Sequence, residues 1–200
     1  MDHLCHGALS RGLQVIFIAN LIVGMVACGG SSEEVDVKEY RISVSDQRPD
    51  VQSAFSYLVD SFNNDVGFDA LTLAQEDDAA NSFVTVTKGL EERDGKVGWG
   101  QWIRVTEVEG GASGFIGGGG RKVYRYSMKL EFDEEYISTR WSSRSDSDEY
   151  ELRKLFYHEV GHGLQMNHVT DSSDIMYYDI SGQKSFSVFY RNVRNYFSGQ

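Results

Sequence analysis

The sequence predicts an α+β fold in which a twisted mixed β-sheet is backed by helices. Several short segments alternate apolar and polar residues, as strands with one buried face do, and longer segments carry helical spacing or helix-start signals. The 200 residues are 40% hydrophobic and 24% charged. This composition suffices for one hydrophobic core and excludes a wholly disordered chain.

The strands are predicted wherever apolar and polar residues alternate, and turn signals at Asp94–Gly95 and Gly110–Gly111 separate the later ones. A glycine run at Gly117–Gly120 is followed by a strand pattern rather than by Lys and Ser or Thr, so it predicts a flexible loop and not a phosphate site. The predicted strands are 40–44, 71–73, 83–87, 100–108 and 123–132.

Three helices are predicted. Pro49 opens the first, over 49–64, at the position where a helix tolerates proline. The polar loop 142–148 supplies capping residues and first-turn acids to a second helix over 148–166. Aromatic residues at helical spacing between Phe186 and Phe197 predict an amphipathic helix at the C-terminus.

The composition excludes several classes of protein. Nineteen basic against thirty acidic residues give a formal charge of −11, which disfavours binding to nucleic acid or to anionic lipid headgroups. The 21 glycines follow no collagen period, and two cysteines cannot form a disulfide framework. We expect a monomer with no nucleic-acid partner.

The N-terminal segment predicts export. Leu13–Ala27 is an apolar run preceded by Arg11, which is typical of a secretory signal peptide. A membrane-spanning helix is the alternative, but about 20 apolar residues are needed to span a bilayer and this run is shorter. Met25–Cys28 resembles a bacterial lipobox, in which cleavage before the cysteine leaves Cys28 to be acylated, for example with palmitate. Three acyl chains would anchor the protein stably to a membrane.

These features divide the chain into a lipoprotein signal peptide over 1–27, a lipid anchor and tether over 28–39, and a folded domain over 40–200. Gly29 after the anchor cysteine favours the outer membrane, by resemblance to lipoproteins of Gram-negative bacteria.

His158, Glu159 and His162 form the pattern His-Glu-x-x-His on the predicted helix 148–166. Two histidines four residues apart lie about 40° apart around a helix and about 6 Å along it, so both imidazoles can reach one metal ion. Glu159 points to another side and can reach a water bound to that ion. Neutral imidazoles that hold an ion, and a carboxylate that accepts a proton from polarised water, are the parts of a hydrolytic zinc site.

A third histidine, His168, follows six residues after His162. On a continuous helix it would lie about 9 Å further along the axis, so the chain must leave the helix and turn back. We expect this exit at Met166–Asn167, with Asn167 in the left-handed conformation. The other two of the five histidines lie in the first six residues, which leaves none for a second zinc site.

Calcium has weaker support than zinc. Acidic, glycine-containing stretches lie around Asp94–Gly95 and at 171–179. Neither has the spacing of an EF-hand loop, and solvated acidic loops are the better interpretation.

The stretch from His158 to Tyr178 resembles the metzincin zinc proteases, whose pattern is HExxHxxGxxH followed by a Met-turn. Within that clan it is similar to the matrixins, which also place the Met eight residues after the third His and follow it with Tyr. The predicted order of strands and helices agrees with that of the clan. The resemblance implies a metzincin-like zinc protease domain with one catalytic Zn²⁺ and protein or peptide substrates.

The resemblance also implies roles for single residues. His158, His162 and His168 would be zinc ligands, Glu159 the general base, and Met176 the apolar floor beneath the metal.

Two tyrosines compete for a further role. Tyr178 occupies the position where astacins and serralysins carry a tyrosine that can bind zinc as a fifth ligand and stabilise the oxyanion. Tyr177 matches the matrixin position instead, and packing suffices to explain either one.

Two departures from the family pattern stand out. Gln165 replaces the usual glycine, so the helix exit lacks the residue that takes positive φ most cheaply. Between Cys28 and the first strand there is no room for the matrixin propeptide, and no spare cysteine could block the zinc.

The sequence therefore predicts an exported, lipid-anchored zinc endopeptidase that binds an extended peptide along a strand at the edge of the cleft. One alternative is a non-catalytic envelope lipoprotein with a structural zinc site, in which a fourth protein ligand would close the site. Another is a zinc hydrolase of a non-peptide bond, such as a peptidoglycan amide.

Overall fold

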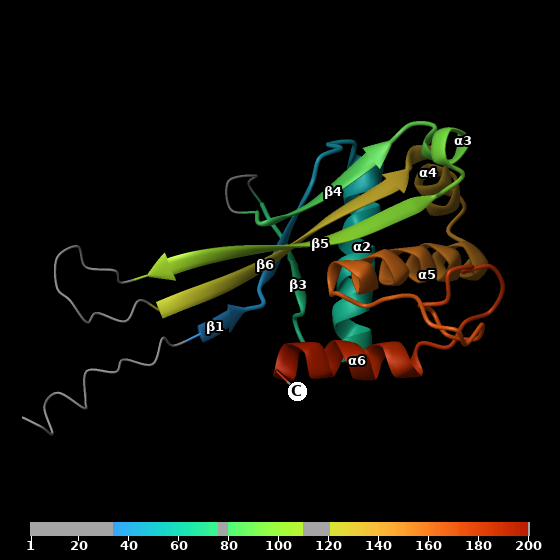
Figure 1. Ribbon diagram of the computed structural model, residues 1–200. Helices are drawn as coiled ribbons and strands as arrows, with labels where there is room; N and C mark the ends of the chain where they lie inside the picture. The colour runs from blue at the N-terminus through green and yellow to red at the C-terminus, as the bar shows by residue number, and fades with distance from the viewer. Residues whose placement is uncertain (1–33, 76–79, 110–120, 200) are drawn as a thin grey trace, which may run out of the picture. The chain divides into compact units, whose positions relative to one another are not determined.

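The structure is a computed structural model that describes residues 34–75, 80–109 and 121–199 (Figure 1). The predicted signal peptide, Cys28 and the Gly117–Gly120 run lie outside the described residues. Of the described residues, 34–35, 106–109 and 121–124 belong to one compact unit, and all others belong to a second unit that contains the histidines. In the described part of the chain, no helix combines the length and apolar character needed to cross a membrane.

The sheet is mixed, as predicted. Its strands run in the order β1-β6-β4-β2-β3, and β5 also pairs with β6. β2 is parallel to β3 and β4, and β4 is parallel to β6, whereas the arrows of β5 and β6 point in opposite directions (Figure 1). The strands are β1 (Glu34–Val37), β2 (Tyr40–Val44), β3 (Leu71–Leu73), β4 (Ser82–Thr87), β5 (Gly98–Glu109) and β6 (Arg121–Asp133).

The three predicted helices are present among the described residues, with two more that are shorter. The full set is α2 (Pro49–Val66), α3 (Leu90–Asp94), α4 (Glu134–Ser143), α5 (Asp146–Gly163) and α6 (Ser187–Ser198). Pro49 occupies the first turn of α2, as the sequence predicts.

The core connects α2 to the sheet and to α5. Phe55 of α2 packs against Phe132 of β6 and Phe156 of α5, with ring centroids 5.4 and 6.1 Å apart. About two turns further along the same face of α2, Phe62 packs edge-on against Tyr157, with ring centroids 5.2 Å apart. Full burial of such an aromatic side chain contributes about 2 kcal/mol or more. These contacts therefore hold α5, which carries two of the three histidines, in a fixed place.

Three elements go beyond the sequence prediction: β1, which lies in the segment expected to be a tether, and the helices α3 and α4. The start of α4 has a clear local cause, because the Asp133 side chain accepts a hydrogen bond from the backbone N–H of Tyr136 at 3.0 Å. Because α4 extends to Ser143, the polar loop expected over 142–148 is reduced to Arg144 and Ser145.

The limits of α5 also differ from the predicted 148–166. Ser145 caps the helix, since its hydroxyl accepts a hydrogen bond from the backbone N–H of Asp148 at 3.2 Å, and the helix begins at Asp146. It ends at Gly163, so the chain leaves the helix earlier than expected.

Candidate metal centre

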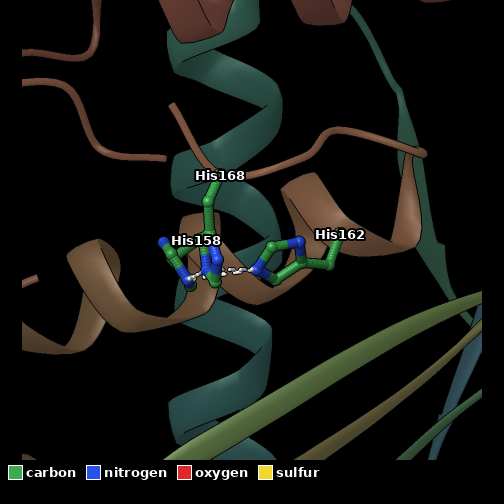
Figure 2. Close-up of side chains that lie close together, drawn as sticks. All are labelled: His158, His162 and His168. Carbon is green, nitrogen blue, oxygen red and sulfur yellow. Dashed lines mark hydrogen bonds between the residues drawn. The ribbon is translucent and has the colours of Figure 1, made fainter. Parts of the chain in front are cut away.

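The end of α5 presents His158 and His162 on one face, as helical spacing requires. Their Nε2 atoms lie 3.2 Å apart. Figure 2 shows both rings pointing toward the ring of His168, which comes from the chain beyond the helix. The Nε2 atom of His168 lies 3.1 Å from that of His162 and 3.3 Å from that of His158.

The turn that brings His168 back is a Schellman motif. The backbone N–H of Met166 donates to the carbonyl of Gly161 at 2.9 Å, and that of Gln165 donates to the carbonyl of His162 at 3.1 Å. Gln165 takes the left-handed conformation, with φ of 67°, at the position that glycine usually holds. The prediction that Asn167 would take this conformation was wrong. The two backbone hydrogen bonds offset a strain of about 1 kcal/mol for a side chain at positive φ.

Backbone carbonyls fix the tautomers of the two helical histidines. Nδ1 of His158 donates to the carbonyl of Ile175 at 2.8 Å, and Nδ1 of His162 donates to that of Met166 at 2.9 Å. A carbonyl only accepts, so Nδ1 carries the proton and Nε2 is left with a lone pair. Lone pairs that face one another at 3.2 Å repel unless a cation lies between them.

The three nitrogens fit a zinc ion. Zinc takes imidazole nitrogens at about 2.0–2.1 Å in a tetrahedron, which places neighbouring ligand nitrogens about 3.3 Å apart. The observed separations of 3.1, 3.2 and 3.3 Å match one face of such a tetrahedron. Among the described residues, His158, His162 and His168 form the group of potential ligands able to hold a metal ion.

The surroundings keep the helical ligands neutral. Burial lowers the pKa of His158 to about 4, with a smaller lowering by the two neighbouring imidazoles, although the hydrogen bond to Ile175 opposes this. Burial likewise lowers the pKa of His162. Neutral imidazole is the form that binds a metal, so both rings are ready to bind at neutral pH.

Glu159 lies next to His158 on α5, and its carboxyl lines the same cavity as the three histidines. Burial raises the pKa of this carboxyl to about 8, and the positive charge of Lys96 opposes the shift. A buried carboxyl beside the candidate metal site can both accept and return a proton.

Two glycines of β5 allow this strand to lie directly against Glu159. A Cβ atom on Gly100 would come within 2.3 Å of the carbonyl oxygen of Glu159, and one on Gly98 within 2.9 Å of its Oε1. Neither glycine was expected at the site from the sequence. Glycines at alternate positions of a strand indicate that another segment approaches the strand backbone closely. This pattern could have identified Gly98 and Gly100 from the sequence.

The cavity has a volume of about 530 Å³ and opens between the start of β5, α5 and the chain after Met176. Tyr178 lines it with 68% of its surface exposed, whereas Tyr177 packs under the ammonium group of Lys184, 5.0 Å from the ring centre. The structure thus brings Tyr178 to the cavity, while its role as a metal ligand stays a prediction.

Met176 is buried against α5. A Cβ atom on Gly161 would lie 2.4 Å from the sulfur of Met176, so the glycine leaves room for the methionine. The turn is closed by Asp174, whose carboxylate accepts from the backbone N–H of Met176 at 2.8 Å. In the same turn, Ile175 supplies the carbonyl that orients His158.

Three imidazoles on a helix and the turn after it, with a buried carboxyl and a methionine turn beneath, form the type of site found in metzincin-like zinc peptidases. The family model for matrixins matches residues 110–193, which include α5, His168 and Met176. This match supports a metzincin-like family and a metallopeptidase that uses zinc and acts on proteins or peptides. Among curated proteins, none matches the chain.

Proposed function

We propose that the protein is a zinc-dependent endopeptidase in which Glu159 is the general base and Cys28 carries a lipid anchor in a bacterial envelope membrane. The observation that supports the catalytic part most directly is the convergence of three Nε2 atoms within 3.3 Å of one another, beside the carboxyl of Glu159 in one cavity.

His158, His162 and His168 would hold the zinc ion, which supplies Lewis-acid polarisation of water and of the scissile carbonyl when bound. The three imidazoles line the cavity, so an ion held by them would face it and could keep a position for water or substrate. An open side distinguishes a catalytic zinc site from a structural one, in which protein ligands fill all positions.

Glu159 would accept a proton from the attacking water and pass it to the leaving amine. Burial favours the protonated form of this carboxyl and Lys96 favours the charged form, and the charge of a bound zinc ion would add to the effect of Lys96. Gly98 keeps the carboxyl in place, because the strand approaches it without an intervening side chain.

The substrate would bind as an extended peptide beside β5. Among the described strands, β5 pairs with β6 and with no other. A strand at the edge of a sheet can pair with a further strand along its outer side. The first residues of this strand line the cavity, so a peptide added along it would pass the three histidines.

The test uses protein lacking residues 1–28, with zinc measured by elemental analysis and cleavage of casein measured with and without a chelator. We expect about one zinc per chain and chelator-sensitive cleavage. Glu159→Gln is expected to keep the zinc and lose activity by about 10²–10⁴-fold. Glu135→Gln, an exposed glutamate on α4, is the matched control.

Full activity in Glu159→Gln would contradict the mechanism. Stoichiometric zinc with no cleavage of any peptide library would favour a non-catalytic lipoprotein with a structural zinc site.

The lipid anchor rests on the sequence around Cys28, which lies outside the described residues. Expression of the full chain in a Gram-negative host should yield an N-terminal peptide that begins with acylated Cys28, detectable by mass spectrometry. We expect Cys28→Ser to move the protein from the membrane fraction to the soluble fraction. An unmodified cysteine in membrane-bound protein would refute the anchor.

A further inference from the structure

The chain from Tyr178 to Ser185, here called the 178–185 wall, forms one side of the cavity with Tyr178, Asp179 and Ile180. Between Tyr178 and Lys184 it has neither helix nor strand, and most of its residues are exposed. A segment of this kind moves readily unless side chains from the rest of the fold hold it.

Lys154 of α5 is a fully buried lysine, with 0% of its surface exposed. Its ammonium group donates to the carboxylate of Glu151 at 2.6 Å and to the carbonyl of Gly182 at 2.9 Å. It also lies 5.3 Å from the ring centre of Tyr150. An ammonium group is costly to bury, so its partners decide whether it is tolerated. One of the two hydrogen-bond partners belongs to the wall.

The far end of the wall is attached through Lys184. Its ammonium group donates to the carbonyl of Ser172 at 2.8 Å, and its backbone N–H donates to the hydroxyl of Tyr150 at 2.7 Å. Tyr150 therefore contacts both lysines, one through its ring and the other through its hydroxyl. Ser185 then pairs with the chain before Met176, through its N–H to Ser173 at 2.6 Å.

We propose that Lys154 is a positioning residue that fixes the 178–185 wall against α5 and so shapes the substrate side of the cavity. Lys154 precedes His158 by one helical turn, and its bond to Gly182 connects the metal-binding helix to the wall. The consequence for substrate binding rests on the proposed peptidase function. The consequence for the wall itself does not.

The test compares Lys154→Met with Glu151→Gln in the zinc-loaded protein. Lys154→Met keeps the aliphatic stem and removes the bond to Gly182, while Glu151, which is partly exposed, can be solvated. Glu151→Gln removes the ion pair, keeps a neutral oxygen that can accept from Lys154, and leaves the bond from Lys154 to Gly182. Lys129→Met, at an exposed lysine of β6, is the control for loss of a surface charge.

Amide hydrogen exchange of residues 180–185 gives the direct answer. We expect Lys154→Met to raise exchange there about tenfold and Lys129→Met to leave it within about twofold. Glu151→Gln takes the counter-charge from a buried ammonium group but keeps the bond to Gly182, so it should raise exchange by less than Lys154→Met. KM for a peptide substrate should rise about fivefold in Lys154→Met with kcat and zinc content close to wild type. If Lys154→Met does not fold, Lys154→Gln, which keeps a neutral donor, is expected to give a smaller effect in the same direction.

Unchanged exchange in the Lys154 variant would overturn the proposal, as would equal effects of Lys154→Met and Glu151→Gln. A wild-type protein without peptidase activity would refute the proposed function instead, and exchange would still decide whether Lys154 fixes the wall.

Discussion

On one side of the cavity, β5 approaches α5 so closely that Gly100 has no room for a Cβ atom, whereas on the other side the 178–185 wall is held by hydrogen bonds from Lys154 and Lys184. The first side depends on the absence of side chains, and the second on buried ammonium groups. The packing of β5 on α5 is therefore sensitive to added side-chain volume. The position of the 178–185 wall is sensitive to the loss of hydrogen bonds.

The largest expected effect comes from adding volume on the β5 side. Gly100→Ala would place a Cβ atom 2.3 Å from the backbone carbonyl of Glu159, which cannot rotate away. Strand and helix must separate, and we expect a loss of about 3 kcal/mol in the free energy of unfolding. Urea denaturation of the zinc-loaded protein measures this. A loss below about 1 kcal/mol would show that the contact is looser than described.

The buried carboxyl on the same side predicts a pH dependence in the metal-free protein. The folded-state pKa of Glu159 is raised from 4.5 to about 8, so its stabilising contribution is complete below 4.5 and is lost as the pH rises through 8. His158 acts in the opposite sense, because its lowered pKa of about 4 makes stability fall only as the pH drops below 6.5.

Between pH 6.5 and 8, Glu159 is therefore expected to dominate over His158, and unfolding free energy should fall by about 2 kcal/mol. Glu159→Gln should remove this slope, measured by denaturation of chelator-treated protein. A slope that persists in the variant would mean that another group is responsible.

The smallest expected effect lies on the other side. Gly182 has φ of 70° and no atom within 4 Å of an added Cβ, so Gly182→Ala meets strain without a clash. We expect a loss of about 1 kcal/mol in unfolding free energy with the zinc content unchanged. If Gly182→Ala lowered the free energy of unfolding as much as Gly100→Ala, the two sides of the cavity would not differ in their sensitivity to added volume.

The site could be predicted from sequence where its geometry is local. His158 and His162 follow from helical spacing, and the return of His168 from the need for a turn. The residue type alone led to the wrong residue for positive φ, Asn167, although the family pattern has its glycine at position 165. The hydrogen bonds of Met166 and Gln165 to the helix end fix the conformation there. The same holds for the fold. Strands and helices with a clear periodic pattern were predicted, whereas α4, whose start depends on the Asp133 cap, was not.

The residues that shape the cavity depend on contacts between distant segments. The alternating Gly98 and Gly100 signal that some segment approaches the strand closely, but the sequence does not indicate that this segment is α5. Lys154 looks like an ordinary helical lysine until its burial is known. The match to the matrixin model starts at residue 110, after both glycines, so it does not include that side of the site.

The orientation of His158 and His162 depends on main-chain oxygens, those of Ile175 and Met166. Such oxygens are present whatever amino acid occupies the position. The identities at 166 and 175 can therefore drift during evolution, or be redesigned, without removing the acceptors, provided that the path of the chain is kept. The orientation of the two histidines is thus set by the path of the backbone and not by the side chains at positions 166 and 175.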